Sequence, residues 1–130
     1  MSEPPPKLAL GSIGWADLTV PNAEAVRAFY EAVVGWKSQP VDMKGYKDHM
    51  MMPAEGGAAV AGICHQRGVN AAVPPCWLLY FVVADLDENM SKVEATGGKR
   101  HGEPRGAKGQ GRHQLIQDPA GLCDYLRAPD

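Results

Sequence analysis

Apolar and polar residues alternate along residues 13–20, Ile-Gly-Trp-Ala-Asp-Leu-Thr-Val, which is the period of a strand with one buried face. Pro21 ends this strand, and Asn22 suits the N-cap of a helix. Apolar residues within 25–33 then recur at helical spacing, and Gly35 suits the C-cap. The pattern therefore predicts a strand followed by an amphipathic helix.

The same pattern returns about 63 positions later, as in a duplicated chain. Residues 77–83 form a second apolar strand, Asp85 takes the cap position, and residues 86–93 carry the next helical stripe before Gly97 and Gly98. Shorter strand candidates follow each helix: 36–40, 46–52 and 58–65, and then 99–103, 113–117 and 122–127. The order predicts an α+β fold of two βαβββ modules, each with a helix on the convex face of a curved sheet.

The length of 130 residues suits one domain with one substantial core. We expect residues 1–11 to form a flexible, Pro-rich arm and residues 12–130 to form a single domain. Module one is expected at about 12–66, a linker rich in Gly, Ala and Pro at about 67–75, and module two at about 76–128.

The charge pattern excludes several classes of partner. The formal net charge is −2 and the basic residues are scattered, so no basic patch for binding nucleic acid is indicated.

No apolar run approaches the length of a membrane span. The three cysteines form no CxxC pair, so neither a disulfide framework nor a zinc knuckle is indicated, and a reducing cytoplasm is favoured. A small molecule is the expected partner.

Several short motifs follow one another along the chain: V-P-N at 20–22, R-A-F-Y at 27–30, V-G-W at 34–36, Y-F-V-V-A-D-L-D at 80–87, A-T-G-G at 95–98 and D-P-A-G at 118–121. In this order they resemble the signature of the vicinal oxygen chelate superfamily, the group of glyoxalases, bleomycin-resistance proteins and dioxygenases. The resemblance covers residues 12–126. It implies that group's fold, with curved mixed sheets enclosing a cleft, and, because many relatives pair, a homodimer.

Enzymes of that family usually hold one divalent metal, and the resemblance implies where its ligands would lie. Counted from the matched motifs, the positions are Trp15, Leu78 and Tyr125, with a fourth near Ile63 or Cys64. Trp and Leu cannot coordinate a hard divalent ion, and a neutral Tyr is a poor ligand. We therefore expect a degenerate metal site, with no metal ligand assigned and no cofactor.

Strand alternation places polar and aromatic side chains on the cleft-facing side of the sheets. Asp17 is a carboxylate on an apolar strand, so it is a candidate catalytic base or substrate anchor, or the partner of a basic residue in a salt bridge. The candidate ligand-binding residues are Trp15, Thr19, His49, Trp77, Tyr80, His113, Tyr125 and Arg127. Simple core packing is the alternative role of the aromatic residues, and a core or surface position that of the histidines.

Two functional hypotheses follow. The first is a small-molecule-binding protein, similar to the antibiotic-sequestering members of the family, whose ligand lies in an aromatic-lined cleft. The second is an enzyme: either a metal-dependent lyase, isomerase or dioxygenase with a displaced site built from His49 or His113 and Asp17, or a metal-free acid–base catalyst that uses Asp17. A partner-interaction module without a ligand is a third reading. The basic, Gly-rich segment 105–112 is expected to form a solvated hairpin loop or a mobile loop over the pocket mouth.

Overall fold

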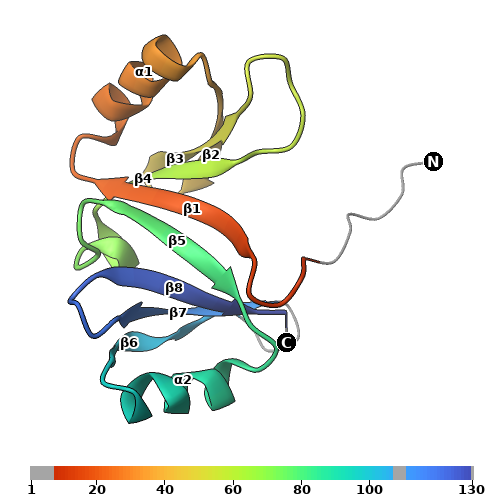
Figure 1. Ribbon diagram of the computed structural model, residues 1–130. Coiled ribbons are helices and arrows are strands. Elements are labelled where there is room, and N and C mark those ends of the chain that lie inside the picture. The colour runs from red at the N-terminus through yellow and green to blue at the C-terminus, as the bar shows by residue number, and fades with distance from the viewer. Residues whose placement is uncertain (1–7, 107–110, 130) are drawn as a thin grey trace. The chain divides into compact units, whose positions relative to one another are not determined.

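The computed structural model describes residues 8–106 and 111–129, and these form two compact units (Figure 1). The first unit is Trp15–Leu78; the second combines residues 8–14 with the described residues from 79 to 129. The elements are, in order, β1 (Ile13–Val20), α1 (Ala23–Val34), β2 (Lys37–Met43), β3 (Tyr46–Met52), β4 (Ala61–His65), the short 3-10 helix η1 (Gly68–Asn70), β5 (Trp77–Val82), α2 (Leu86–Ala95), β6 (Lys99–Arg105), β7 (Arg112–Gln117) and β8 (Cys123–Ala128). This is βαβββ twice, so the predicted α+β duplication is confirmed.

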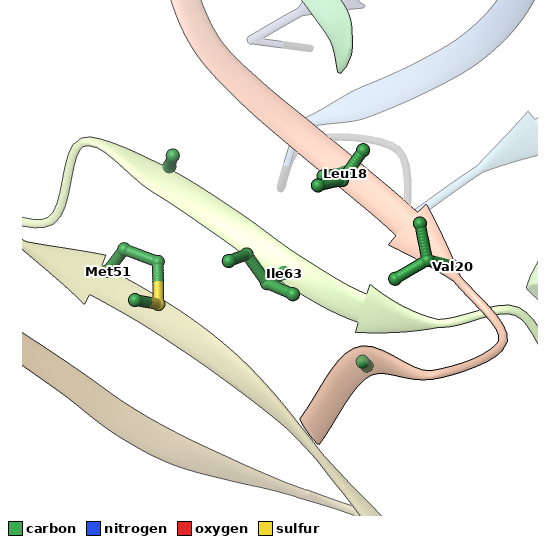
Figure 2. Close-up of a cluster of buried hydrophobic side chains, with 6 residues drawn as sticks. Leu18, Val20, Met51 and Ile63 are labelled. Atoms are coloured by element: carbon green, nitrogen blue, oxygen red, sulfur yellow. The ribbon is translucent and has the colours of Figure 1, made fainter. Parts of the chain in front are cut away.

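The strands of the first unit are ordered β2-β3-β4-β1, with β1 parallel to β4 and the other neighbours antiparallel. Leu18 pairs with Ile63, and Ile63 with His49, so these three side chains share one face. That face carries the core of Leu18, Val20, Ala23, Met51, Ala61 and Ile63, packed with Val26 and Tyr30 of α1. Figure 2 shows its four larger side chains on β1, β3 and β4. Helix α1 therefore covers the sheet face that carries Leu18 and Val20, as the alternation in residues 13–20 predicts.

The strands of the second unit are ordered β5-β8-β7-β6, with β5 parallel to β8. The core lies between this sheet and α2 and consists of Leu86, Met90, Ile116, Leu126 and Ala128. Phe81 and Val83 pack against the same core, which leaves Tyr80 and Val82 on the other face of β5. Each unit thus has one face under a helix and one face turned away from it.

Local turn chemistry follows the sequence closely. The Asp85 side chain accepts a hydrogen bond of 3.0 Å from the N–H of Glu88 and so caps α2. Asn22 stands at the start of α1 without such a bond. In the D-P-A-G turn, Asp118 Oδ1 accepts the N–H groups of Ala120 and Leu122, at 2.8 and 3.0 Å. Asp118 therefore fixes the turn between β7 and β8.

Strand β2 differs most from its prediction. It continues past Pro40 to Met43, because its pairing with β3 runs to the Met43–Tyr46 pair across a two-residue turn. Gly45 has a φ of 89° there, a conformation that glycine adopts without strain. Pro40 is tolerated because β2 is the outer strand of its sheet.

Two expected segments lie partly outside the described residues: positions 1–7 of the arm and 107–110 of the basic loop. At the end of the arm, the N–H of Gly11 donates to the carbonyl of Val82 at 2.7 Å. Neither helix in the described part of the chain has the length and apolar character needed to cross a membrane.

Candidate ligand-binding faces

A row of basic side chains crosses the second unit on the face turned away from α2. Arg105 on β6 pairs with His113 on β7, and His113 pairs with Arg127 on β8. Leu126 and Ala128, on either side of Arg127, belong to the core under α2, so Arg127 points the other way. The register therefore brings Arg105, His113 and Arg127 together, a grouping that the sequence alone did not predict.

Two tyrosines support this row. The Tyr80 and Tyr125 rings stack with centroids 4.4 Å apart, and the His113 ring lies 5.7 Å from the first and 5.6 Å from the second. Tyr80 exposes 9% of its surface and Tyr125 exposes 3%, whereas His113 is partly exposed. The two buried tyrosine rings therefore support the imidazole ring of His113 by packing against it. His113 is the member of the cluster that a ligand can contact.

The same surroundings keep His113 neutral. Burial lowers the pKa of His113 below its ordinary value of 6.5, and the charges of Arg105 and Arg127 lower it further. A neutral imidazole offers one hydrogen-bond donor and one acceptor. The row therefore presents two permanent cations with a neutral hydrogen-bonding group between them, which suits an anionic group on a small molecule.

In the first unit, Asp17 lies on the face turned away from α1. The indole N–H of Trp15 donates to Asp17 Oδ1 at 2.6 Å. Gly62, the pairing partner of Asp17 on β4, makes room for this carboxylate, since a Cβ at Gly62 would overlap Asp17 Oδ1. Thr19 lies on the same face, but only 3% of its surface is exposed, so a ligand can contact little of it. Trp15 and Asp17 remain the partly exposed candidates of this unit.

Cys64, on β4, is an inert thiol. It pairs with Thr19 across β1 and β4, and burial raises its pKa well above the usual range. The negative charges of Asp17 and Asp48 act in the same direction. Cys64 therefore stays protonated and does not act as a nucleophile or thiolate ligand at neutral pH.

Two of the sequence candidates lie elsewhere. His49 shares the helix-facing side with Ile63, and its Nε2 is 2.9 Å from Oε1 of Glu24 in α1. Trp77 packs on the core beneath α1 and donates from Nε1 to the Tyr30 hydroxyl at 3.1 Å. His49 and Trp77 therefore lie on the helix-facing side and not on the face of Trp15, which is the core position named as the alternative for both. In β3 it is Met50, not His49, that pairs with Gly62 and shares its face.

On β8 the side chains alternate between the two faces as the sequence pattern predicts. Tyr125 faces Tyr80, and its neighbour Asp124 pairs with Ile116 on the helix side. Burial raises the pKa of Asp124 to about 6, and the charge of Asp118 contributes. Leu78 is fully buried. Asp124 and Tyr125 therefore lie on opposite faces of β8.

These features define a class of protein: a duplicated βαβββ chain whose helix-free faces carry the polar groups. The sequence profile of the Glyoxalase/Bleomycin resistance protein/Dioxygenase superfamily matches residues 12–122. The chain belongs to this superfamily.

Sequence relatives are longer than this chain. "Putative glyoxylase CFP32" of Mycobacterium bovis is 32% identical over 119 residues, which are 92% of this chain and 44% of the relative. "Anthracycline biosynthesis protein DnrV" of Streptomyces peucetius is 33% identical over 111 residues, 85% of this chain and 39% of the relative. The chain thus spans less than half the length of these relatives.

Solved structures share the fold at low identity. A Streptomyces coelicolor methylmalonyl-CoA epimerase in complex with 2-nitronate-propionyl-CoA has a TM-score of 0.59 and 19% identity, over 92% of this chain and 98% of that one. The methylmalonyl-CoA epimerase of Mycobacterium tuberculosis has a TM-score of 0.59 and 18% identity, over 95% and 93%. These similarities concern the fold alone.

Proposed function

We propose that this chain is a small-molecule-binding protein whose ligand carries an anionic group, held by the row of Arg105, His113 and Arg127. The observation that carries the proposal is the register that sets these three side chains side by side on one face. Arginine pairs with carboxylate and phosphate oxygens in a bidentate way, and a neutral imidazole adds a directional hydrogen bond.

Binding is proposed to be independent of a metal. The positions at which the resemblance implies metal ligands carry Trp15, Leu78 and Tyr125, none of which suits a hard divalent ion. A degenerate metal site on a retained fold is the arrangement of a binding protein rather than of a Lewis-acid catalyst.

Among proteins of the same fold, the methylmalonyl-CoA epimerases bind acyl-CoA esters, which are anionic small molecules.

The second candidate is a metal-free enzyme in which Asp17 takes up a proton or anchors the substrate. It is favoured by the bond from Trp15 Nε1 to Asp17, which holds the carboxylate in one orientation. A carboxylate fixed in this way can act as a base, and it can also anchor a hydroxyl or ammonium group of the ligand.

Homodimerisation is proposed from the family resemblance and is tested by light scattering.

Isothermal titration with benzoate and with phenyl phosphate, each in EDTA and in added Zn²⁺, tests the proposal. Both probes combine a planar ring with one anionic group. Equal affinity in the two buffers, weakened about tenfold or more by Arg127→Met, is the expected result. Binding that requires Zn²⁺, or no binding of either probe, would contradict the proposed function.

A further inference from the structure

Three side chains of types that can bind a metal ion meet on the helix-facing side of the first unit. Glu24 lies in the first turn of α1, His49 on β3 and His65 at the end of β4. Oε1 of Glu24 is 2.9 Å from Nε2 of His49 and 3.7 Å from Nε2 of His65. One donor atom from each of the three residues lies within 4.8 Å of the other two.

This spacing matches a metal coordination shell. Donor atoms that each lie about 2.1 Å from a zinc ion are about 3.0 Å apart in octahedral and about 3.4 Å apart in tetrahedral geometry. The two distances from the Glu24 oxygen, 2.9 and 3.7 Å, bracket these values. Two imidazoles and one carboxylate form a donor set that zinc and neighbouring transition metals prefer over Mg²⁺ or Ca²⁺.

The cluster is also reachable and held in place. His49 exposes 7% and His65 15% of its side chain, so the sheet fixes both rings, whereas Glu24 exposes 58% and opens the cluster to solvent. The other Glu24 oxygen accepts from Arg27 at 3.1 Å. The N–H of His65 donates to Asp48 Oδ1 at 2.9 Å. An ion can therefore enter from solvent and meet donors whose positions are already set.

One feature limits the affinity. Nδ1 of His49 is buried and has no hydrogen-bond partner among the described residues. Metal-bound histidines usually donate their second ring nitrogen to a carboxylate or carbonyl, and loss of that bond weakens binding by about 10-fold to 100-fold. We therefore expect micromolar rather than nanomolar binding.

We propose that Glu24, His49 and His65 form a binding site for a divalent transition-metal ion of the zinc class. The site lies on the opposite face of the sheet from Trp15 and Asp17. The protein supplies three ligands and leaves the remaining positions to water. A bound ion would fasten the first turn of α1 to β3 and β4, and so stabilise the folded chain in proportion to its concentration.

Titration of the metal-free, tag-free chain with Co²⁺ tests this site, because the absorption bands of bound cobalt report both stoichiometry and ligand type. Glu24→Gln and His65→Gln each remove one donor with little change in shape, whereas His49→Gln would disturb the buried sheet face. His101→Gln is the matched control, since His101 is exposed and bonds to Gln117 in the other unit. All variants carry Cys76→Ser, because Cys76 is an exposed thiol that could bind cobalt by itself.

We expect one equivalent of Co²⁺ per chain, displaced by Zn²⁺, without the charge-transfer band of a thiolate ligand. Glu24→Gln and His65→Gln should each weaken binding at least tenfold, and His101→Gln should not. Binding of phenyl phosphate should be unchanged in all three, so failure of the metal site and failure of the proposed function give different results. Absence of Co²⁺ binding at millimolar concentration, or equal binding by Glu24→Gln, would overturn the proposal.

Discussion

The rings of Tyr80 and Tyr125 lie nearly parallel, 16° apart in orientation and 4.4 Å apart between centroids. The two residues are paired neighbours on β5 and β8, and both are almost completely buried. Because the His113 ring rests on both of them, the stack connects the packing of the second unit with the position of its candidate ligand-binding group.

Tyr125→Ala should therefore destabilise the chain by about 3–5 kcal/mol, the usual cost of deleting a buried aromatic ring. Tyr125→Phe keeps the stack and should cost about 1 kcal/mol. Urea unfolding of both variants measures the difference. Similar stabilities for the two variants would show that the ring stack contributes little.

The pKa of His113 should be measurably low. Two-dimensional NMR of the histidine side chains is expected to give His113 a pKa below 6.5. Arg127→Met removes one repulsive charge and should raise this pKa, although burial, the largest cause, keeps it below the ordinary value. A lowered pKa means that the unfolded chain binds the proton more readily. The free energy of unfolding should therefore decrease as the pH falls through the unfolded pKa of His113, which is about 6.5.

Asp124 should act in the opposite direction. Its folded pKa of about 6 lies above the ordinary value of 3.8, so the folded chain binds the proton more readily. Stability from this group is present below the unfolded pKa and is lost as the pH rises through about 6. Asp124→Asn should raise the melting temperature at pH 8 and leave it nearly unchanged at pH 4. An equal shift at both pH values would rule out the ionised carboxylate as the cause.

Gly62 should not tolerate a side chain. Gly62→Ala places a Cβ against Asp17 Oδ1, so the carboxylate must leave Trp15 or the strands must separate. We expect a loss of about 1–3 kcal/mol in urea unfolding, as for other overpacked sites. Asp17→Ser with Gly62→Ala relieves the overlap and should recover part of this loss. No recovery in the double variant would place the strain elsewhere.

Local rules in the sequence were sufficient to predict the fold. Alternation in 13–20, the cap at Asp85 and the turn at Asp118 each depend on near neighbours in the chain, and the structure confirms them. Strand register is a longer-range property, so the alternation alone does not decide on which face of β3 His49 lies. A shift of one residue in the β3 alternation reverses every side chain.

Glu24 illustrates why the sequence alone did not predict the cluster of Glu24, His49 and His65. In the sequence it is an ordinary acidic residue in the first turn of a helix, where the helix dipole stabilises a negative charge. Its contacts with His49 and His65 join residues 25 and 41 positions apart, and only the packing of α1 on the sheet brings them together. The row of Arg105, His113 and Arg127 depends in the same way on pairing across β6, β7 and β8.

The most direct test of the proposed ligand site is the NMR spectrum of His113 during titration with phenyl phosphate in EDTA. We expect a saturable shift of the His113 ring signals, with no comparable shift of His101, which lies near the other end of β6. Arg127→Met should weaken the apparent affinity about tenfold or more while the chain stays folded. A His113 signal that does not move, or that moves only after a metal ion is added, would contradict metal-independent binding of an anionic ligand at His113.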